Sequence, residues 1–364
     1  MDPVRPDYDA ANVRGVVPAL LTGTSPAWMP DLLAEADAVV LLVLDGLGTH
    51  SLDAHGSMLP TLAGMQRSDL TTVVPSTTSS ALTSIVTGLT PSQHGVTGFR
   101  MRVDRRVLNV LRWRYEDGHP PPDPYEIQRH AGFLGRPVPV VTKREFRGSG
   151  FSEAHLRGSR FFGWSATSTL VERCRELVED GEKLVYAYYP GVDTVAHEFG
   201  LLDGYFTREL AATDRLVGEL LSALPAHAAV AVTADHGHVQ VGPDGWVELD
   251  GLRELVASCS GDGRFRYLHA ERGSAMELAA AAREEFGHVA WVFERDELLD
   301  DGWLGAEVAA SARRRVGDVV LAAREPVGFV DPALPRETSL VAAHGSVTPD
   351  EMQVPLLAAT GGGP

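Results

Sequence analysis

Cysteine is scarce in this chain of 364 residues, which contains only two. Cys174 and Cys259 cannot form a framework of disulfides. A chain of this length needs none, because it can bury a large hydrophobic core. Both cysteines lie in stretches that resemble amphipathic helices, and we expect them to be buried, unreactive thiols.

Long apolar runs are also missing. No run approaches the roughly 18 apolar residues of a membrane span. The polar N-terminal stretch MDPVRPDYDAANVRG has no apolar segment of the kind found in secretory signals. We therefore expect a soluble, cytoplasmic protein with no membrane partner.

Basic charge is in short supply, since 32 Lys and Arg face 49 Asp and Glu and the net charge is −17. General binding to nucleic-acid polymers requires a basic surface, so this composition argues against it. One phosphate-bearing ligand is still compatible, because bound cations reverse the sign of the local charge. The 44% hydrophobic content is that of an ordinary globular protein.

Short apolar runs alternate with helical patterns along the chain. This alternation predicts an α/β fold with a mostly parallel sheet sandwiched by helices. A helix over SSALTSIVTGL should follow the second strand and end at Gly88 and Pro91. The predicted strands are 38–44, 70–74, 137–142, 184–189, 228–234 and 353–359, and two further predicted helices are 166–179 and 204–223.

Two segments interrupt the alternation, at about 99–165 and 245–340. We predict a single catalytic domain over residues 1–364, in which both segments are cap-like insertions. They should lie near the carboxyl edge of the sheet, where substrate selectivity commonly resides.

Residues of metal-ligating type follow several of the predicted strands. Ligands placed after the strands of an α/β fold converge at one edge of the sheet. Taken singly, each has an ordinary structural interpretation, such as a turn aspartate or a buried histidine. As a set, three carboxylates, three imidazoles and one hydroxyl can hold two divalent cations. The carboxylates and imidazoles are Asp45, Asp193, His197, Asp235, His236 and His344.

The hydroxyl comes from the run PSTTSS, where Thr78 sits at the expected turn from strand to helix. A bound metal would make this hydroxyl a usable nucleophile at neutral pH. The backbone N–H groups that follow, beginning at Ser79, would face an anion. The alternative is that these hydroxyls only cap the helix. His94 and His238 also look motif-like, but we interpret His94 as a turn or capping residue and His238 as a supporting or structural one.

Taken in order, these residues resemble the alkaline phosphatase superfamily, and within it the type I phosphodiesterase/nucleotide pyrophosphatase family. The resemblance rests on VLDGLG, PSTTSSALTSIVTGLTPSQHGVTGF, YPGVDTVAHEFG, TADHGH and AAHGS, and it extends over about 38–357. It implies an alkaline phosphatase-like fold with two bound Zn²⁺, or Mn²⁺ or another divalent cation in their place. Zinc accepts this mixture of nitrogen and oxygen ligands.

The resemblance also implies roles for single residues. Thr78 would attack phosphorus and form a covalent phospho-threonine that water then hydrolyses. One zinc would be bound by Asp193, His197 and His344, and the other by Asp45, Thr78, Asp235 and His236.

One position departs from the family pattern. Diesterases of the family usually carry an asparagine three residues after the nucleophile, and this chain has Ala81 there. Loss of one such donor costs about two to three orders of magnitude in rate in a site built around it. Either another group replaces it or the substrate differs from that of the diesterases, and the candidate groups are Ser79, Ser80, Arg112, Lys143 and Arg144.

The sequence therefore predicts a hydrolase of phosphodiester or pyrophosphate bonds in a small, nucleotide-like phosphate ester. A phosphomonoesterase or a phosphonate hydrolase on the same metal core is the alternative. A metal-dependent phosphomutase and a metal-stabilised binding protein are further alternatives, and threonine as nucleophile and the modest insertions argue against the mutase. The substrate and the oligomeric state stay open. Candidate aromatic residues for stacking on a base are Trp113, Tyr115, Phe161, Phe162, Trp164 and Tyr189.

Overall fold

The computed structural model describes residues 2–202 and 204–362. A seven-stranded sheet lies at its centre, with the strand order β2-β18-β9-β1-β8-β6-β7. The strands are β1 (Ala38–Leu44), β2 (Gln66–Thr71), β6 (Pro139–Lys143), β7 (Arg160–Trp164), β8 (Leu184–Tyr189), β9 (Ala228–Thr233) and β18 (Gln353–Thr360).

Six of the seven strands point in the same direction, because only β18 is antiparallel to its two neighbours. The predicted mostly parallel α/β sheet is therefore confirmed. Strand β1 lies in the middle, all seven of its residues are buried, and it pairs with β8 on one side and β9 on the other. A continuous apolar run such as AVVLLVL is typical of a parallel strand covered on both faces.

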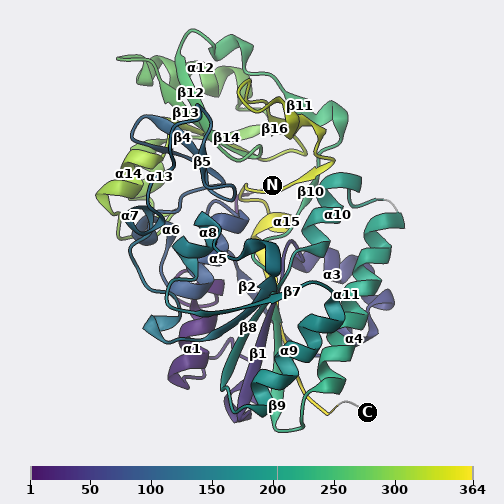
Figure 1. Cartoon of the computed structure of the whole chain (residues 1–364). Coiled ribbons are helices and arrows are strands. Elements are labelled where there is room, and N and C mark those ends of the chain that lie inside the picture. Colours follow the sequence, from purple (N-terminus) through teal and green to yellow (C-terminus); the bar gives the residue numbers. More distant parts are fainter. Residues whose placement is uncertain (1, 203, 363–364) are drawn as a thin grey trace.

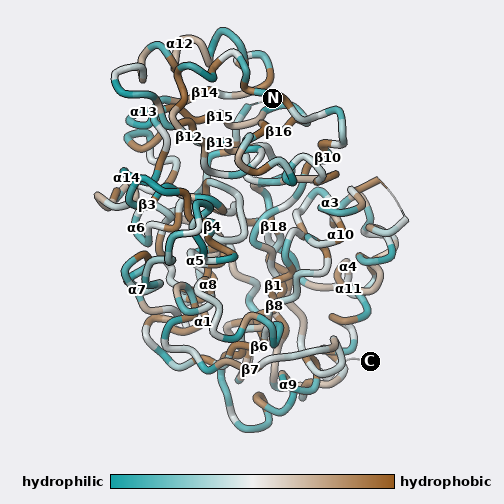
Figure 2. Tube along the Cα trace, turned by 45° about the horizontal axis from the view of Figure 1, so that its top comes forward, coloured by the Kyte–Doolittle hydropathy of each residue, from teal (hydrophilic) through white to brown (hydrophobic). Residues whose placement is uncertain are grey.

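Helices cover both faces of this sheet (Figure 1). The strands at its centre are also the most hydrophobic part of the chain (Figure 2). On one face lie α9 (Thr167–Glu179) and α11 (Gly204–Ala223), and on the other lie α1 (Val16–Thr22), α5 (Thr78–Thr87) and α8 (Gly150–His155).

Two strands of the structure differ from the prediction. The strand expected at 70–74 lies at 66–71, because the chain leaves the sheet at Thr72 and runs towards the segment of His344, where the Ser76 N–H donates to the Gly345 carbonyl at 3.1 Å. Strand β7 was not predicted. Its sequence RFFGW forms an edge strand with only Trp164 buried, so it lacks the continuous apolar run of a central strand.

The two segments predicted as insertions are only partly separate from the main sheet. β6 and β7 both lie within 99–165 yet belong to the main sheet, so that boundary was wrong. The first part forms a small antiparallel sheet of β3 (Arg100–Val103), β4 (Arg106–Asn109) and β5 (Arg114–Tyr115). Within 245–340, a four-stranded antiparallel sheet contains β12 (Val256–Gly261), β13 (Phe265–Ala270), β15 (Val319–Ala323) and β14 (Ala290–Glu294), with α12 (Ala275–Phe286) packed against it.

The cysteine prediction is right for one residue and wrong for the other. Cys174 is fully buried in α9, and burial raises the pKa of its thiol to about 12. Cys259 lies in strand β12 and is partly exposed, so the helix expected there is absent. Among the described residues, no helix is both long and apolar enough to cross a membrane.

A buried ion pair ties the second sheet to the main one. Arg264, in the turn between β12 and β13, donates to both carboxylate oxygens of Glu351 at 2.8 and 3.0 Å, and both side chains are fully buried. Glu351 lies in α15 (Pro349–Met352), directly before β18, and also accepts from the Ser346 N–H at 2.8 Å. The pair therefore fixes the chain on the C-terminal side of His344.

We expect Glu351→Ala to lower the free energy of unfolding by about 3–5 kcal/mol, because it leaves the Arg264 charge buried without a partner. Denaturant unfolding of both proteins measures the difference. The exposed pair Arg253–Asp250, with side chains 73% and 70% exposed, supplies the control. Asp250→Ala should cost about 1 kcal/mol or less. Equal losses in the two variants would contradict this role for the buried pair.

Candidate active site

The register of the central strands brings three chain segments to one edge of the sheet. Leu44 is paired with Tyr189, and Val43 with Thr233. Asp45 therefore stands level with the start of α10 (Gly191–Phe199) and with the residues that follow β9. Two hydrogen bonds connect these segments: Asp193 N–H donates to the Asp45 carbonyl at 3.0 Å, and Gly46 N–H donates to Asp235 Oδ1 at 3.1 Å.

Helix α10 supplies the next two predicted ligands. Asp193 and His197 lie one turn apart on it, and Nε2 of His197 is 3.2 Å from Oδ1 of Asp193. Their four-residue spacing places both side chains on one face, as predicted. Burial lowers the pKa of His197, but the neighbouring Asp193 carboxylate outweighs burial and raises this pKa to about 9. The gap between these two atoms therefore favours a positive charge, either a proton or a metal cation.

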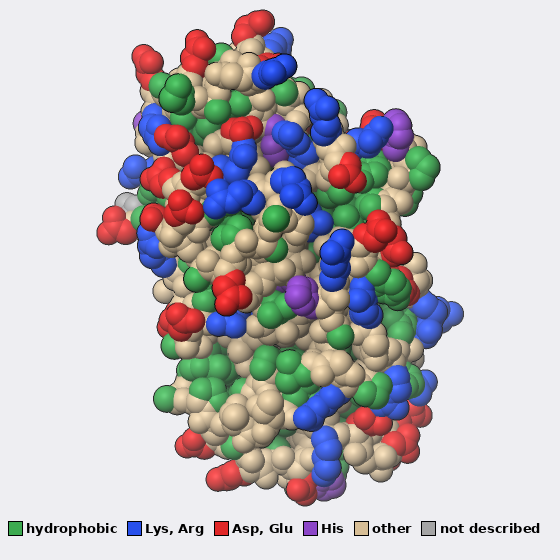
Figure 3. All heavy atoms as spheres, turned by 90° about the vertical axis from the view of Figure 1, so that its left-hand side faces the viewer, with side chains coloured by type: hydrophobic (Ala, Val, Ile, Leu, Met, Phe, Trp, Pro, Cys, Tyr) green, Lys and Arg blue, Asp and Glu red, His purple; other side chains and the backbone are tan. Residues whose placement is uncertain are grey.

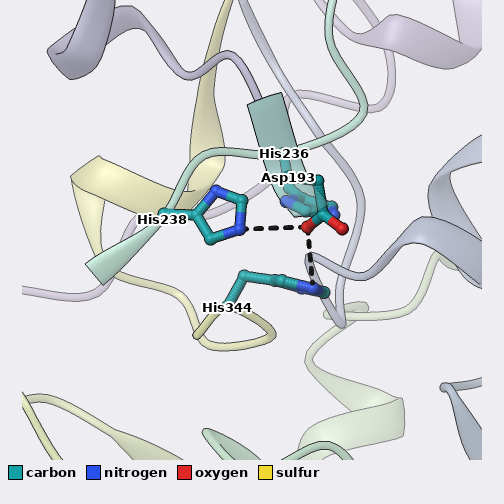
Figure 4. Close-up of side chains that lie close together, drawn as sticks. All are labelled: Asp193, His236, His238 and His344. Carbon is teal, nitrogen blue, oxygen red and sulfur yellow. Dashed lines mark hydrogen bonds and ion pairs between the residues drawn. The ribbon is translucent and has the colours of Figure 1, made fainter. Parts of the chain in front are cut away.

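His344 approaches from a different part of the chain, just after β17 (Ala342–Ala343). Its ring stacks on that of His236, with 3.6 Å between the ring centroids. Its Nε2 lies 3.8 Å from Oδ1 of Asp193. Figure 4 shows Asp193 between His344 and His238, with dashed lines joining its carboxylate to both rings.

His238 is closer to the centre of the site than we predicted. Its Nε2 lies 3.0 Å from Oδ1 of Asp193, shorter than the distance from either His197 or His344 to the same oxygen. Two groups of side chains have donor atoms close enough together to hold a metal ion, and they share His236. One group is Asp193, His236, His238 and His344, and the other is Asp45, Asp235 and His236.

The hydrogen bonds of the four histidines fix which ring nitrogen faces this site. In every ring Nδ1 lies beside a backbone carbonyl, which can only accept, so Nδ1 carries the proton and Nε2 keeps its lone pair. Metal-binding histidines commonly have this arrangement, because the outer bond orients the ring. The pairs are His197 with Ala342 at 2.7 Å, His236 with Gly237 at 3.1 Å, His238 with Gly46 at 3.2 Å and His344 with Ser76 at 3.0 Å.

The carboxylates give an independent test of whether cations fit. Oδ1 of Asp45 and Oδ2 of Asp235 are buried and lack a hydrogen-bond partner among the described residues. Burial and mutual repulsion raise the pKa of Asp45 well above its usual range, and burial raises that of Asp235 to about 7. Buried carboxylates of this kind are normally paired or bound to a metal. The oxygen and nitrogen donors present therefore fit divalent cations.

Thr78 is the first residue of α5, and its hydroxyl points into the same group of side chains. Its Oγ1 lies 3.1 Å from Nε2 of His236. The neighbouring Thr77 hydroxyl turns away and donates to Oδ1 of Asp262 at 2.7 Å. The two adjacent threonines therefore have different surroundings, and only Thr78 faces the predicted ligands.

Two cavities meet at Thr78; the surface of both is mainly apolar, and they differ in the charged side chains that line them. The first has a volume of about 230 Å³; we call it the apolar cavity, and its lining includes Leu82, Leu111, Phe146, Phe151, Tyr186 and Tyr188. The second, of about 300 Å³, we call the polar cavity because ionisable side chains line it, namely Arg112, Asp262, Arg336, Glu337, His197 and His344. Thr78, Asp193 and Leu111 belong to both.

Several of the residues that we proposed to contact substrate lie elsewhere. Ala81 is fully buried in the main core and lines neither cavity, so this position offers no place for a donor to the phosphoryl group. Lys143 pairs with Glu145 at 3.4 Å, and Arg144 donates to Ser165 at 3.1 Å. Neither lines a cavity at Thr78. Of the proposed cations, only Arg112 does.

The other proposed contacts are also displaced. Ser80 donates to the Val96 carbonyl at 2.9 Å, and Ser79 is buried. Neither serine side chain lines a cavity at Thr78. The same holds for the six aromatic candidates, Trp113, Tyr115, Phe161, Phe162, Trp164 and Tyr189. Tyr188 takes the place of Tyr189, because alternate residues of a strand point to opposite faces. His94 is a structural residue, as predicted, because its Nε2 contacts Ser84 Oγ at 2.9 Å.

Sequence reasoning missed Asp262 and Arg336. Burial raises the pKa of Asp262 to about 7, and its carboxylate accepts from Thr77 and lines the polar cavity. It comes from the turn between β12 and β13, and GDGR has the form of an ordinary turn. No local pattern could have placed it beside α5.

Comparisons with known proteins agree with the family resemblance seen in the sequence. The family model for type I phosphodiesterase/nucleotide pyrophosphatase matches residues 39–347. No curated protein matches the sequence.

Solved structures show the same fold at low sequence identity. Murine ectonucleotide pyrophosphatase/phosphodiesterase 5 is 16% identical, with a TM-score of 0.64 over 88% of this chain and 87% of that one. Its inactive threonine-to-alanine variant in complex with AMP gives a TM-score of 0.66 at 16% identity, over 89% of this chain and 88% of that one. Phosphonoacetate hydrolase from Sinorhizobium meliloti 1021, in complex with phosphonoacetate, is 18% identical with a TM-score of 0.64 over 89% of this chain and 90% of that one.

The family match covers far more than half of the chain, and it includes every segment that carries a predicted ligand. The resemblance noted in the sequence is thereby confirmed. The chain belongs to the type I phosphodiesterase/nucleotide pyrophosphatase family.

Proposed function

We propose that this protein is a metal-dependent hydrolase that cleaves phosphodiester or pyrophosphate bonds in a small, nucleotide-like substrate. Membership of the family and the fold support hydrolysis of phosphodiester or phosphonate bonds at a metal core. The observation that carries the proposal is the position of the Thr78 hydroxyl. It lies at the junction of two cavities and beside buried carboxylates whose oxygens lack partners.

We assign the metal ligands to two sets. Asp193, His197 and His344 form one set, and Asp45, Thr78, Asp235 and His236 form the other. The short distance between His238 and Asp193 makes His238 a further donor of the first set. When bound, two divalent cations would lower the pKa of the Thr78 hydroxyl and neutralise the charge of the phosphoryl oxygens.

Thr78 acts as the nucleophile in this proposal. Its hydroxyl gives up its proton to solvent and Oγ1 forms a bond to phosphorus, while the bond to the leaving oxygen breaks on the opposite side, with the leaving group taking the electron pair. Water then hydrolyses the phospho-threonine and restores the hydroxyl.

The N-terminus of α5 stabilises the charge that develops in this step. Ala81 is the first residue whose N–H bonds back into the turn, to the Thr77 carbonyl at 2.9 Å. The N–H groups of the residues before it, from Thr78 to Ser80, have no backbone acceptor among the described residues. Free N–H groups at the start of a helix favour an anion. These N–H groups therefore donate to the phosphoryl oxygens in place of the side chain that the family usually has at the position of Ala81.

The apolar cavity suggests how the substrate is selected. Four aromatic side chains line it, Phe146, Phe151, Tyr186 and Tyr188, and it opens directly on Thr78. An aromatic or otherwise apolar group bound there would gain roughly 25 cal/mol for each Å² removed from water. We therefore propose that one ester group of the substrate is a base or another flat apolar group.

A phosphonate hydrolase is the second candidate. Arg112 and Arg336 line the polar cavity, and neither guanidinium has an ion-pair partner in the part of the chain that the structure describes. Free guanidinium groups bind carboxylates and phosphates well. Phosphonoacetate carries both kinds of group, so turnover of phosphonoacetate at a rate above that of nitrophenyl diesters would favour this alternative.

Metal content gives the first functional prediction. Protein purified without chelator should contain about two divalent ions per chain, and two-metal sites hold them roughly 3.5–4 Å apart. Elemental analysis for zinc and manganese measures the number. One ion or fewer, with no increase after zinc is added, would contradict the two-metal assignment.

The adjacent threonines give a matched pair of variants. Thr78→Ala should abolish turnover while metal content stays nearly unchanged, and Thr78→Ser should keep measurable activity because the hydroxyl survives. Thr77→Ala is the control, since its hydroxyl bonds Asp262 and faces away from the ligands. An inactive Thr77→Ala together with an active Thr78→Ala would show that Thr77, and not Thr78, is the nucleophile.

The apolar cavity predicts a preference among diesters with the same leaving group. The value of kcat/KM for bis-p-nitrophenyl phosphate should exceed that for methyl p-nitrophenyl phosphate by at least about tenfold after correction for intrinsic reactivity. Leu111→Ala should reduce this ratio, since Leu111 lines the cavity. Leu134 is also exposed (49%, against 39% for Leu111) and lines neither cavity at Thr78, so it supplies the control variant. An unchanged ratio in Leu111→Ala would contradict this role for the cavity.

A further inference from the structure

A cavity of about 400 Å³ lies away from Thr78 and shares no lining residue with the apolar or polar cavity. We call it the arginine cavity. Its walls come from strand β3, the turn after it, the first residue of α13 (Arg295–Asp300) and the end of α14 (Ala310–Arg315). Five arginines line it, namely Arg102, Arg105, Arg295, Arg314 and Arg315.

The charges in this cavity do not balance. Only two carboxylates line it, Asp104 and Asp318, which leaves an excess of three positive charges. Asp318 forms an ion pair with Arg295. Within the described residues, none of the other four arginines has an ion-pair partner. Such a concentration of basic charge stands out in a chain whose net charge is −17.

The excess positive charge is energetically unfavourable at Arg315, because this side chain is only 6% exposed. Its Nη1 group donates to the carbonyls of Gly95 and Ile127, and these bonds do not neutralise its charge. Burial, together with the nearby Arg314 and Arg129, lowers the pKa of Arg315 to about 10. A buried charge is normally paired with an opposite one. Here the described residues provide no such partner within ion-pair distance.

Two of the arginines that line the cavity are accessible from solvent. Figure 3 looks onto the side of the molecule that carries α14, where Lys and Arg side chains lie in the upper half of the face among Asp and Glu side chains. Arg314 lies at the end of α14 and is exposed, and Arg102 is partly exposed. Both can therefore reach a ligand from solvent without a rearrangement of the core.

We propose that the arginine cavity binds a small phosphorylated anion with at least two negative charges, such as a diphosphate group. The planar guanidinium group presents paired donors that match phosphate oxygens. A volume of about 400 Å³ falls in the range of small-molecule sites. The anion would neutralise Arg315 and use Arg102 and Arg314 as its outer contacts. This site is separate from the proposed catalytic centre and does not depend on the chemistry proposed for Thr78.

The test is a calorimetric titration of the full-length, metal-loaded protein with methylenediphosphonate, a diphosphate analogue with a P–C–P link. The probe is compared between wild type and Arg102→Ala/Arg314→Ala. Any binding at the proposed catalytic metals is common to both proteins, so their difference reports on the arginine cavity alone. We expect the double variant to lose one equivalent of bound probe, or to bind it at least tenfold more weakly.

Arg313→Ala is the matched control, because Arg313 lies on the same helix but does not line the cavity and pairs with Asp296 and Asp300. It should bind the probe as wild type does. Binding in the double variant equal to wild type would overturn the proposal, and so would an equal loss in Arg313→Ala, since that would show a bulk charge effect. Neither result would bear on the activity of Thr78, which is measured with substrate.

Discussion

The site depends above all on three carboxylates held in a small volume, two of them buried and the third partly exposed. Asp45, Asp193 and Asp235 come from different segments, and all three lie where water cannot solvate them fully. Mutual repulsion in a medium of low dielectric constant is unfavourable unless positive charge lies between the groups. Nε2 of four histidine rings faces the same volume while Nδ1 of each ring donates to a backbone carbonyl, so the rings can offer lone pairs to a cation there. Divalent cations satisfy both the oxygens and the nitrogens.

The architecture follows from this requirement. Parallel pairing of β1 with β8 and β9 sets Asp45, α10 and Asp235 at the same level, so three ligand segments are in place once the sheet forms. His344 has no such strand partner in the main sheet. It is held by its own bond to the Ser76 carbonyl, and the Arg264–Glu351 pair anchors the chain after it. The second sheet therefore contributes to the site through one buried ion pair and through Asp262.

The sequence predicted the strands and ligand positions that depend on local residue patterns. Strands 38–44 and 184–189 were right to the residue, because continuous apolar runs identify buried parallel strands, and the placement of the ligand residues follows from those strands. The sequence did not predict contacts between segments that lie far apart in the chain. Asp262 meets Thr77 across 185 residues of sequence, and β7 lacks an apolar run because it lies at the sheet edge. Lys143 and Arg144 stand after a strand, as expected, but turn towards Glu145 and Ser165. The direction in which a side chain points was therefore the least predictable feature.

Anomalous diffraction at the zinc and manganese absorption edges, from crystals grown without chelator, tests the central claim most directly. We expect two peaks per chain, roughly 3.5–4 Å apart. One should lie beside Asp193 and His344, and the other beside Asp45 and Asp235, with Nε2 rather than Nδ1 of each histidine towards the metal. A single peak, or peaks remote from the buried oxygens of Asp45 and Asp235, would contradict the claim that buried carboxylates are balanced here by a pair of cations.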